Sequence, residues 1–367
     1  MTEQDRSGPT RFVVLGGYLG AGKTRLATTL ARYLKETHGK SVAIITNDQG
    51  NVLVDTEYVR NAGFDVREIL GGCFCSNLPE FVKNARSLVQ MGRPDVIIAE
   101  PIGTSTNILA SVLVPLRTMH PGEFDVAPLM VVVDGTSAKK LLDKSAVFGP
   151  NSRKLIPVQQ AHDAELILVS KADLMSHSGV EEVIRVINNE VPSAEIIPYS
   201  SVTLENIDKI ATAVLSSRSS TKVPMAVDNR FFAMEKASMG WFNASAGIAT
   251  AGKLDLYAYI TEILRGVAAR FGTEAVAHVK VMVESEKVAV KMSLVQDSLQ
   301  TDGIKGGRFI EGEGRIVMNA RISATPEELE RSILEVLQTS SASAGIKLVD
   351  VKHSSLKPHG ETPSFLK

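Results

Sequence analysis

The chain has 367 residues, 44% of them hydrophobic, which is enough for two domains with sizeable buried cores. Its formal net charge of -1 gives no bias toward nucleic acid or an anionic membrane surface. Residues 1–10 lack the apolar stretch of a secretory signal, and the longest apolar runs are shorter than the ~20 residues that cross a bilayer. We therefore expect a cytoplasmic protein with neither nucleic-acid nor membrane partners.

Strands and helices are predicted to alternate over the first 215 residues. The apolar strands are continuous and the helices between them are amphipathic, which predicts an α/β fold whose mostly parallel sheet is covered by helices on both faces. Ligands on such sheets bind at the carboxyl ends of the strands. Strands are expected at residues 11–15, 41–46, 65–70, 95–99, 129–133, 165–169 and 195–198, and helices at 24–34, 78–91 and 104–119.

The second half of the chain has a different pattern, which predicts a smaller α+β domain after a polar linker. Strands are expected at 241–250, 275–283, 287–294, 315–323 and 347–352, and helices at 254–271 and 326–338, the last capped by Thr325. The predicted organisation is a flexible N-terminus (1–10), a nucleotide-binding domain (11–215), a linker (216–229), a C-terminal domain (230–353) and a flexible tail (354–367).

Residues 17–24 fit the phosphate-binding loop, or P-loop, in which two glycines five residues apart precede Lys and Thr. Backbone N–H groups of such a loop close around phosphate oxygens, the lysine reaches the β- and γ-phosphates, and the threonine hydroxyl binds Mg²⁺. A strand before the loop and a helix after it supply the required context. We therefore predict a P-loop NTPase domain whose phosphate contacts are Gly17, Gly20, Ala21, Gly22, Lys23 and Thr24.

Residues 170–173 follow a predicted strand of the same sheet and favour GTP over ATP. The Asp173 carboxylate can accept from N1–H and the 2-amino group of guanine, donors that adenine lacks. Lys171 would pack its aliphatic stem along the base, and Ser170 begins the motif. The alternative is that Asp173 begins a helix and Lys171 is solvated. Ser201 follows the last strand, where its backbone is expected at guanine O6 or in a simple helix cap.

Three further residues at strand ends are candidates for the chemistry of the γ-phosphate. Glu100 can hold Mg²⁺ through water, and the N–H of Gly103 can detect the γ-phosphate. Asp48 can orient the attacking water or a magnesium-bound water, with an Asx turn as the alternative. The predicted catalytic residues are therefore Lys23, Asp48 and Glu100, whereas Asp134 is interpreted as structural.

The two cysteines of the chain, Cys73 and Cys75, are only two positions apart. In an extended segment both sulfurs face the same side, and thiolates favour Zn²⁺ or another thiophilic ion. Other side chains, water, or the same pair from a second subunit would have to complete a tetrahedral site. Two small buried hydrophobic side chains are the alternative. The seven histidines form no run of metal-ligand spacing.

Together these motifs resemble those of the CobW-type metallochaperone GTPases, relatives of HypB and UreG, on residues 17–24, 72–75, 100–103 and 170–173. The resemblance covers roughly residues 11 to 215. It implies GTP hydrolysis coupled to delivery of zinc, cobalt or nickel to a client metalloprotein or cofactor pathway, with the Cys-x-Cys loop binding the metal. Two positions depart from the family pattern: Ser76 stands where a third cysteine is usual, and Ser170 stands where asparagine is usual.

The leading hypothesis is a slow GTPase in which loss of the γ-phosphate changes the conformation around Cys73 and Cys75. A second hypothesis is a GTPase gatekeeper that activates a cobalamin-type or other metalloenzyme by protein contact. A third is a homodimeric carrier of an Fe–S cluster or zinc held by four cysteines at a two-fold interface.

Overall fold

The computed structural model describes residues 8–48, 54–70, 74, 77–120, 122–142, 155–225 and 229–358. The chain divides into two compact units. Of the described residues, those within 8–48 and 63–235 form the first unit, and those within 54–62 and 236–358 form the second. This division differs from the expected one at two places: residues 54–62, inside the range 11–215, group with the second unit, and residues 230–235 group with the first.

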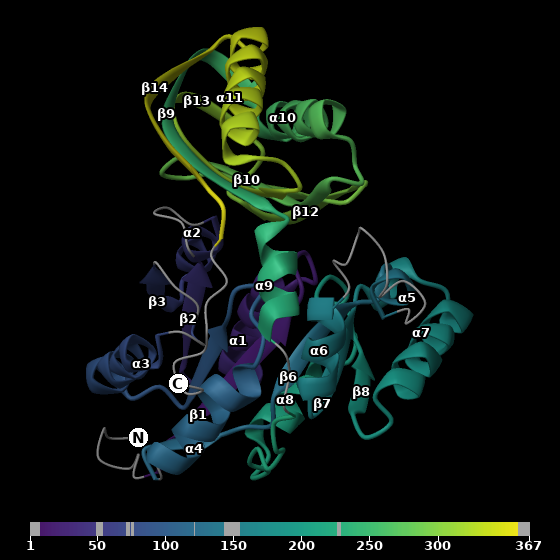
Figure 1. Ribbon diagram of the computed structural model, residues 1–367. Coiled ribbons are helices and arrows are strands. Elements are labelled where there is room, and N and C mark those ends of the chain that lie inside the picture. The colour runs from purple at the N-terminus through teal and green to yellow at the C-terminus, as the bar shows by residue number, and fades with distance from the viewer. Residues whose placement is uncertain are drawn as a thin grey trace. The chain divides into compact units, whose positions relative to one another are not determined.

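The first unit contains the parallel sheet expected from the sequence (Figure 1). Its strand order is β3-β2-β4-β1-β6-β7-β8, with β5 also paired to β1, and every pair is parallel. Because β1 is central, the loop that follows it lies among the carboxyl ends of its neighbours. The strands are β1 (Thr10–Gly17), β2 (Val42–Asp48), β3 (Asp65–Leu70), β4 (Val96–Glu100), β5 (Phe124–Val126), β6 (Met130–Asp134), β7 (Leu166–Ser170) and β8 (Glu195–Pro198).

Helices of the first unit follow the strands in alternation. The expected helix over 104–119 instead begins as a π-helical turn, η2 (Leu109–Leu113), before it continues as α4 (Val114–Met119). The other helices are α1 (Lys23–His38), α3 (Leu78–Gly92), α5 (Ala138–Leu142), α6 (Leu155–Asp163), η4 (Ala172–Leu174), α7 (His177–Glu190), α8 (Ile207–Leu215) and α9 (Asn229–Ala237), whose last two residues belong to the second unit.

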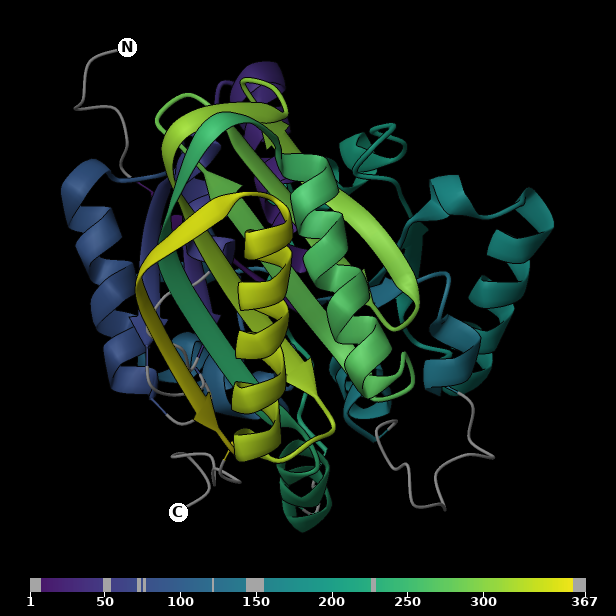
Figure 2. The same cartoon turned by 90° about the horizontal axis from the view of Figure 1, so that it is seen from above.

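The second unit is built on an antiparallel sheet of order β12-β11-β10-β13-β9-β14. Helices α10 (Leu256–Phe271) and α11 (Pro326–Ser343) lie side by side on one face of it (Figure 2). The Thr325 hydroxyl accepts from the N–H of Glu328 at 3.2 Å, so the predicted cap of α11 is confirmed. The strands are β9 (Gly240–Asp255), β10 (Val276–Glu284), β11 (Ala289–Val295), β12 (Ser298–Lys305), β13 (Phe309–Ile322) and β14 (Ile346–Leu356), so the last strand continues beyond residue 353, where the tail was expected to begin.

The short helix α2 (Val54–Asn61) belongs to the second unit although it follows β2 in the chain. Its Asp55 forms ion pairs with Lys280 on β10 and, at 2.9 Å, with Lys291 on β11. Val54 packs with apolar side chains of the same strands, and its N–H donates to the Asn319 amide at 3.0 Å. The C-terminal sheet therefore holds a segment that the sequence places directly after the strand end that carries Asp48.

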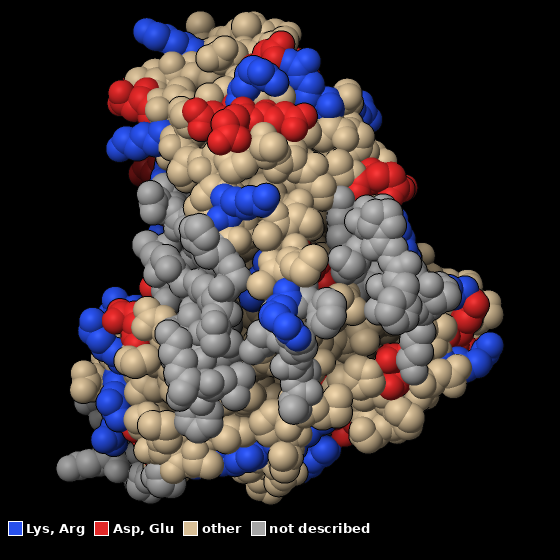
Figure 3. Space-filling view, viewed as in Figure 1, with Lys and Arg blue, Asp and Glu red and all other residues tan. Residues whose placement is uncertain are grey.

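Acidic and basic side chains are both present among the mostly uncharged residues of the described part of the face in Figure 3. Among the residues that the structure describes, no helix combines the length and the apolar character needed to cross a bilayer.

Helix α6 ends on a buried carboxyl group, Asp163, whose ionisation depends on its surroundings. Burial raises the pKa of Asp163 to about 6 from its ordinary value of 3.8, although the hydrogen bond from Gln159 and the charges of Lys222 and His162 oppose this rise. The folded state therefore binds this proton more tightly than the unfolded chain does, and the resulting stability is lost as the pH rises from about 4 through 6.

Replacing Asp163 by asparagine is expected to raise the free energy of unfolding at pH 8 by up to about 3 kcal/mol, and to change it little at pH 4, where the carboxyl is already neutral. Thermal unfolding of both proteins, followed by circular dichroism at the two pH values, measures this difference. Asp208→Asn removes the same charge from an exposed position and serves as the control. A gain that is equal at both pH values would contradict the assignment.

Candidate nucleotide-binding site

The loop between β1 and α1 has the geometry of a phosphate cradle. Gly22 precedes α1 with φ 93°, a left-handed conformation that favours glycine. Lys23 is buried, and its ammonium group donates to the carbonyls of Gly17 at 2.9 Å and Tyr18 at 3.4 Å. The lysine charge is therefore held inside the loop, next to the N-terminus of a 16-residue helix. This combination suits an anion such as a triphosphate.

Thr24, the residue after Lys23, contacts Glu100 at the end of β4. The Thr24 hydroxyl donates to Glu100 Oε1 at 2.9 Å, and their exposed fractions are 5% and 6%. The structure thus brings together two oxygen donors that the sequence places 76 residues apart. Hydroxyl and carboxylate oxygens are hard ligands of the kind that Mg²⁺ prefers, so this donor set fits the predicted cation.

The Ser170 side chain joins β7 to the phosphate loop. Its hydroxyl donates to the carbonyl of Ala21 at 2.8 Å, with a longer contact to the carbonyl of Val133 at 3.3 Å. A serine can therefore make the loop hydrogen bond at the position where the family pattern has asparagine. This bond fixes the start of residues 170–173 relative to the loop that follows β1.

Lys171 is largely buried rather than solvated, because its ammonium group pairs with Asp134 Oδ2 at 2.6 Å. Asp134 uses its other oxygen to accept from the N–H and the hydroxyl of Thr136, at 3.0 and 2.7 Å. Asp134, which we interpreted from the sequence as structural, therefore positions Lys171. Asp173 lies on η4 with its side chain exposed.

Ser201 is half-buried in the loop after β8. That loop is shaped by Ser200, which is fully buried and whose hydroxyl accepts from the N–H groups of Val202 at 3.0 Å and Thr203 at 3.1 Å. These bonds form a tight turn rather than the cap of α8, because α8 begins at Ile207, further along the chain.

Gly103 packs directly against the phosphate loop. A Cβ atom on Gly103 would lie 2.9 Å from the backbone nitrogen and 2.7 Å from Cδ2 of Leu19, which leaves no room for a side chain. The loop after β4 and the loop after β1 are therefore in backbone contact.

Gln160, on α6, is a site residue that the sequence did not reveal. Its amide Nε2 donates to the carbonyls of Gly103 at 3.1 Å and Ser105 at 2.7 Å. The residue is 5% exposed and belongs to no motif. Its partners are 57 and 55 positions away in the chain, so no local pattern could have indicated the contact.

The cysteine pair lies outside the described residues, and so does the side chain of Asp48, although its backbone ends β2. Phe74, between the two cysteines, is described and fully buried, with its ring 4.4 Å from that of Phe81. Its N–H donates to the Asn47 amide oxygen at 3.1 Å. The centre of the Cys-x-Cys segment is therefore bonded to the residue next to Asp48. In the described part of the chain, no three His, Cys, Asp or Glu side chains could together hold a metal ion.

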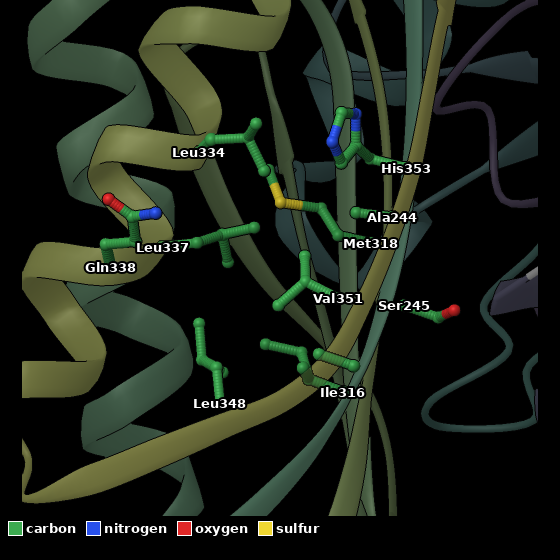
Figure 4. Close-up of a pocket in the computed structure, with 11 residues that line it drawn as sticks. Ala244, Ser245, Ile316, Met318, Leu334, Leu337, Gln338, Leu348, Val351 and His353 are labelled. Carbon is green, nitrogen blue, oxygen red and sulfur yellow. The ribbon is translucent and has the colours of Figure 1, made fainter.

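A cavity of about 180 Å³ in the second unit is of a different kind (Figure 4). Leu334 and Leu337 on α11 project toward Met318 and Val351 on the strands. Its lining contains no Asp, Glu, Lys or Arg, so it has no charge with which to bind a triphosphate. This cavity is therefore not a candidate for the nucleotide site.

Comparison with known proteins supports the assignment of a nucleotide-binding domain. Residues 11–198 match the family described as CobW/HypB/UreG, nucleotide-binding domain. Zinc chaperone CobW from Sinorhizobium sp is 26% identical over 238 residues, which cover 58% of this chain and 64% of that protein. Zinc chaperone YeiR from Escherichia coli (strain K12) is 29% identical over 168 residues, 45% of this chain and 47% of that protein.

A third relative, zinc-regulated GTPase metalloprotein activator 1 from Dictyostelium discoideum, is 25% identical over 219 residues, 50% of this chain and 44% of that protein. The chain thus spans between about half and two thirds of the length of these relatives. The family match covers the whole phosphate loop, the Glu100 and Gly103 loop and the Ser170 strand end, and it confirms the resemblance predicted from the motifs. The chain therefore belongs to the CobW/HypB/UreG family.

Proposed function

We propose that the chain binds and hydrolyses GTP with Mg²⁺, and that this cycle controls the binding and delivery of Zn²⁺ by Cys73 and Cys75 to a client metalloprotein. The family assignment supports the nucleotide half of the proposal, and relatives named zinc chaperones and a zinc-regulated activator support the metal half. Co²⁺ and Ni²⁺ are the other ions that two thiolates would accept.

The nucleotide half is supported by four groups that converge on the loop after β1. Lys23 would contact the β- and γ-phosphates, and the N–H of Gly103 would contact the γ-phosphate. Thr24 and Glu100 would hold Mg²⁺, which neutralises charge on the phosphate oxygens when it is bound. Asp48 would orient the attacking water. Asp173 would read the guanine edge, with Lys171 along the base and the backbone of Ser201 at O6.

The single observation that carries the coupling between nucleotide and metal is the hydrogen bond from Phe74 to Asn47 at 3.1 Å. Phe74 is fixed in the core by its buried ring, so it moves only together with the strand end that it contacts. Occupation of the γ-phosphate position beside Asp48 therefore changes the backbone between the two thiols. Two thiolates leave a tetrahedral zinc ion open to a further ligand, which suits an ion that must be released to a client.

The experiment that tests the proposal measures the zinc affinity of the purified protein against a chromophoric chelator, with GDP or a non-hydrolysable GTP analogue present. We expect the two affinities to differ by about 5-fold or more, as typical coupling energies produce. Cys73→Ser/Cys75→Ser should lose the binding. Asn47→Ala should keep zinc binding but lose most of its dependence on the nucleotide, because Phe74 is no longer tied to the strand end.

Equal zinc affinity in the two nucleotide states would contradict the coupling, and wild-type affinity in the double-cysteine variant would contradict the metal site. If that variant bound no zinc yet still activated a client, the protein would act as a gatekeeper by contact. Iron and acid-labile sulfide in protein purified anaerobically would point instead to a cluster carrier.

A further inference from the structure

We propose that Gln160 is a positioning residue that holds the Gly103 loop where it can distinguish GTP from GDP. This inference rests on the proposed function, since it concerns the same nucleotide site. Gln160 lies on α6, and its side-chain hydrogen bonds go neither to the phosphate loop nor to the predicted base-reading residues. What Gln160 contacts is the loop between Glu100 and α4.

The geometry of the amide determines what Gln160 can do. One nitrogen, Nε2, donates to two backbone carbonyls, Gly103 O at 3.1 Å and Ser105 O at 2.7 Å. These carbonyls face away from water, because Gly103, Ser105 and Gln160 are all buried. Without the amide, both carbonyls would lose the Gln160 donor in the protein interior. The loop would be expected to move so that they regain a hydrogen-bond partner.

Gly103 has little freedom to move without consequence. On its other side it packs against Leu19 of the phosphate loop, with no space for even a methyl group. The amide of Gln160 and the backbone of Leu19 thus confine Gly103 from two directions. The direction of its N–H, which is the group predicted to contact the γ-phosphate, follows from this confinement.

Helix α6 itself is a rigid support for the amide. The N–H of Ile156, in its first turn, donates to Glu235 Oε2 on α9 at 3.1 Å, where the negative charge also favours the helix N-terminus. The side chain of Ile156 is fully buried and packs with Tyr18 and Phe232. A side chain held by packed neighbours in this way can define a geometry that a mobile one cannot.

The neighbouring residue provides a matched control. Gln159 is also buried, at 8% exposed compared with 5% for Gln160, but its amide donates within α6 to Asp163 Oδ1 at 2.9 Å. Replacement of either glutamine by methionine keeps the length of the side chain and removes the donor. Only Gln160→Met removes a bond to the Gly103 loop.

The test compares binding of GDP and of a non-hydrolysable GTP analogue, both with Mg²⁺, by isothermal titration calorimetry. We expect Gln160→Met to weaken the analogue by about 10-fold or more, the effect of losing one to two net hydrogen bonds, and to change GDP binding by less than about 2-fold. The turnover number for GTP should fall. KM for GTP should rise, in line with the weaker binding of the analogue. Gln159→Met should leave both nucleotides as in the wild type.

Gln160→Glu provides a second variant should Gln160→Met fold poorly. The introduced carboxylate has no proton to donate at pH 8 and would repel the two carbonyls, whereas its protonated form could donate one hydrogen bond. Its affinity for the analogue should therefore improve relative to GDP as the pH is lowered toward 6. A purely structural role would weaken GDP and analogue equally and would show no such pH dependence.

The two failures are distinguishable. If the wild-type protein bound neither nucleotide, the proposed function would be wrong. If the wild type preferred the analogue and Gln160→Met retained the same preference as Gln159→Met, the proposed function would survive and the role of Gln160 would be overturned.

Discussion

Replacing Lys23 by alanine is expected to lower the turnover number for GTP hydrolysis by about 10²- to 10³-fold, the usual effect of removing one preorganised group that stabilises the transition state. Lys23 is buried, and its ammonium group is already held by the carbonyls of Gly17 and Tyr18. Its charge is therefore in place before the nucleotide arrives. Phosphate release at saturating GTP and Mg²⁺ measures the effect.

The control for this prediction is Lys35→Ala, which removes the same charge from an exposed position in the last turn of the same helix. It should leave turnover within about 2-fold of the wild type, because exposed single charges contribute little. Hydrolysis that persisted undiminished in Lys23→Ala would mean that the nucleotide is hydrolysed at another site.

Replacing Asp55 by alanine is expected to lower the free energy of unfolding of the second unit by about 3–5 kcal/mol, because it removes the paired counter-charge of the buried Lys291 and of the half-buried Lys280. Lys280 and Lys291 both pair with Asp55, and Lys291 is only 4% exposed. Trp241, the only tryptophan of the chain, lies on β9, so its fluorescence during urea unfolding reports on this unit.

The acid dependence of this effect has a definite direction. Burial alone would raise the pKa of Asp55, but the charges of Lys280 and Lys291 lower it well below its ordinary 3.8. The stabilisation is therefore fully present above about pH 5 and is lost as the pH falls below the unfolded value. The difference between wild type and Asp55→Ala should shrink accordingly in acid.

A matched triple replacement, Asp55→Leu with Lys280→Met and Lys291→Met, removes all three charges together. It should recover most of the stability, since buried ion pairs replaced by apolar side chains of similar volume are often neutral or stabilising. If Asp55→Ala proved as stable as the wild type at pH 7, the ion pairs on α2 would be without consequence for this unit.

The parallel sheet and the phosphate loop could be predicted from the sequence because contiguous residues specify them. A run of apolar residues up to Leu15, glycines at 17, 20 and 22, and Lys23 followed by Thr24 each specify a conformation or a contact locally. Strand ends that carry Glu100 and Ser170 followed from the same reasoning, because parallel strands present their carboxyl ends at one edge.

Partners of those residues were decided by tertiary structure. Gln160 lies on a helix without any motif, and it reaches Gly103 only because α6 packs beside the loop after β4. Asp55 pairs with Lys291, 236 residues away, so a segment that was predicted to belong to the domain 11–215 is held on the C-terminal sheet. The local sequence pattern does not predict such contacts. Their contribution to stability depends on the burial of the two groups and on the distance between them, and both are set only by the fold.

The sequence by itself predicted where phosphates would bind, since a strand, a glycine loop and a helix in series leave their backbone N–H groups pointing at one place. Only the folded chain decided how that place is coupled to the rest of the molecule. The bonds from Phe74 to Asn47 and from Gln160 to Gly103 each join segments whose separation in sequence is bridged by packing rather than by any local rule.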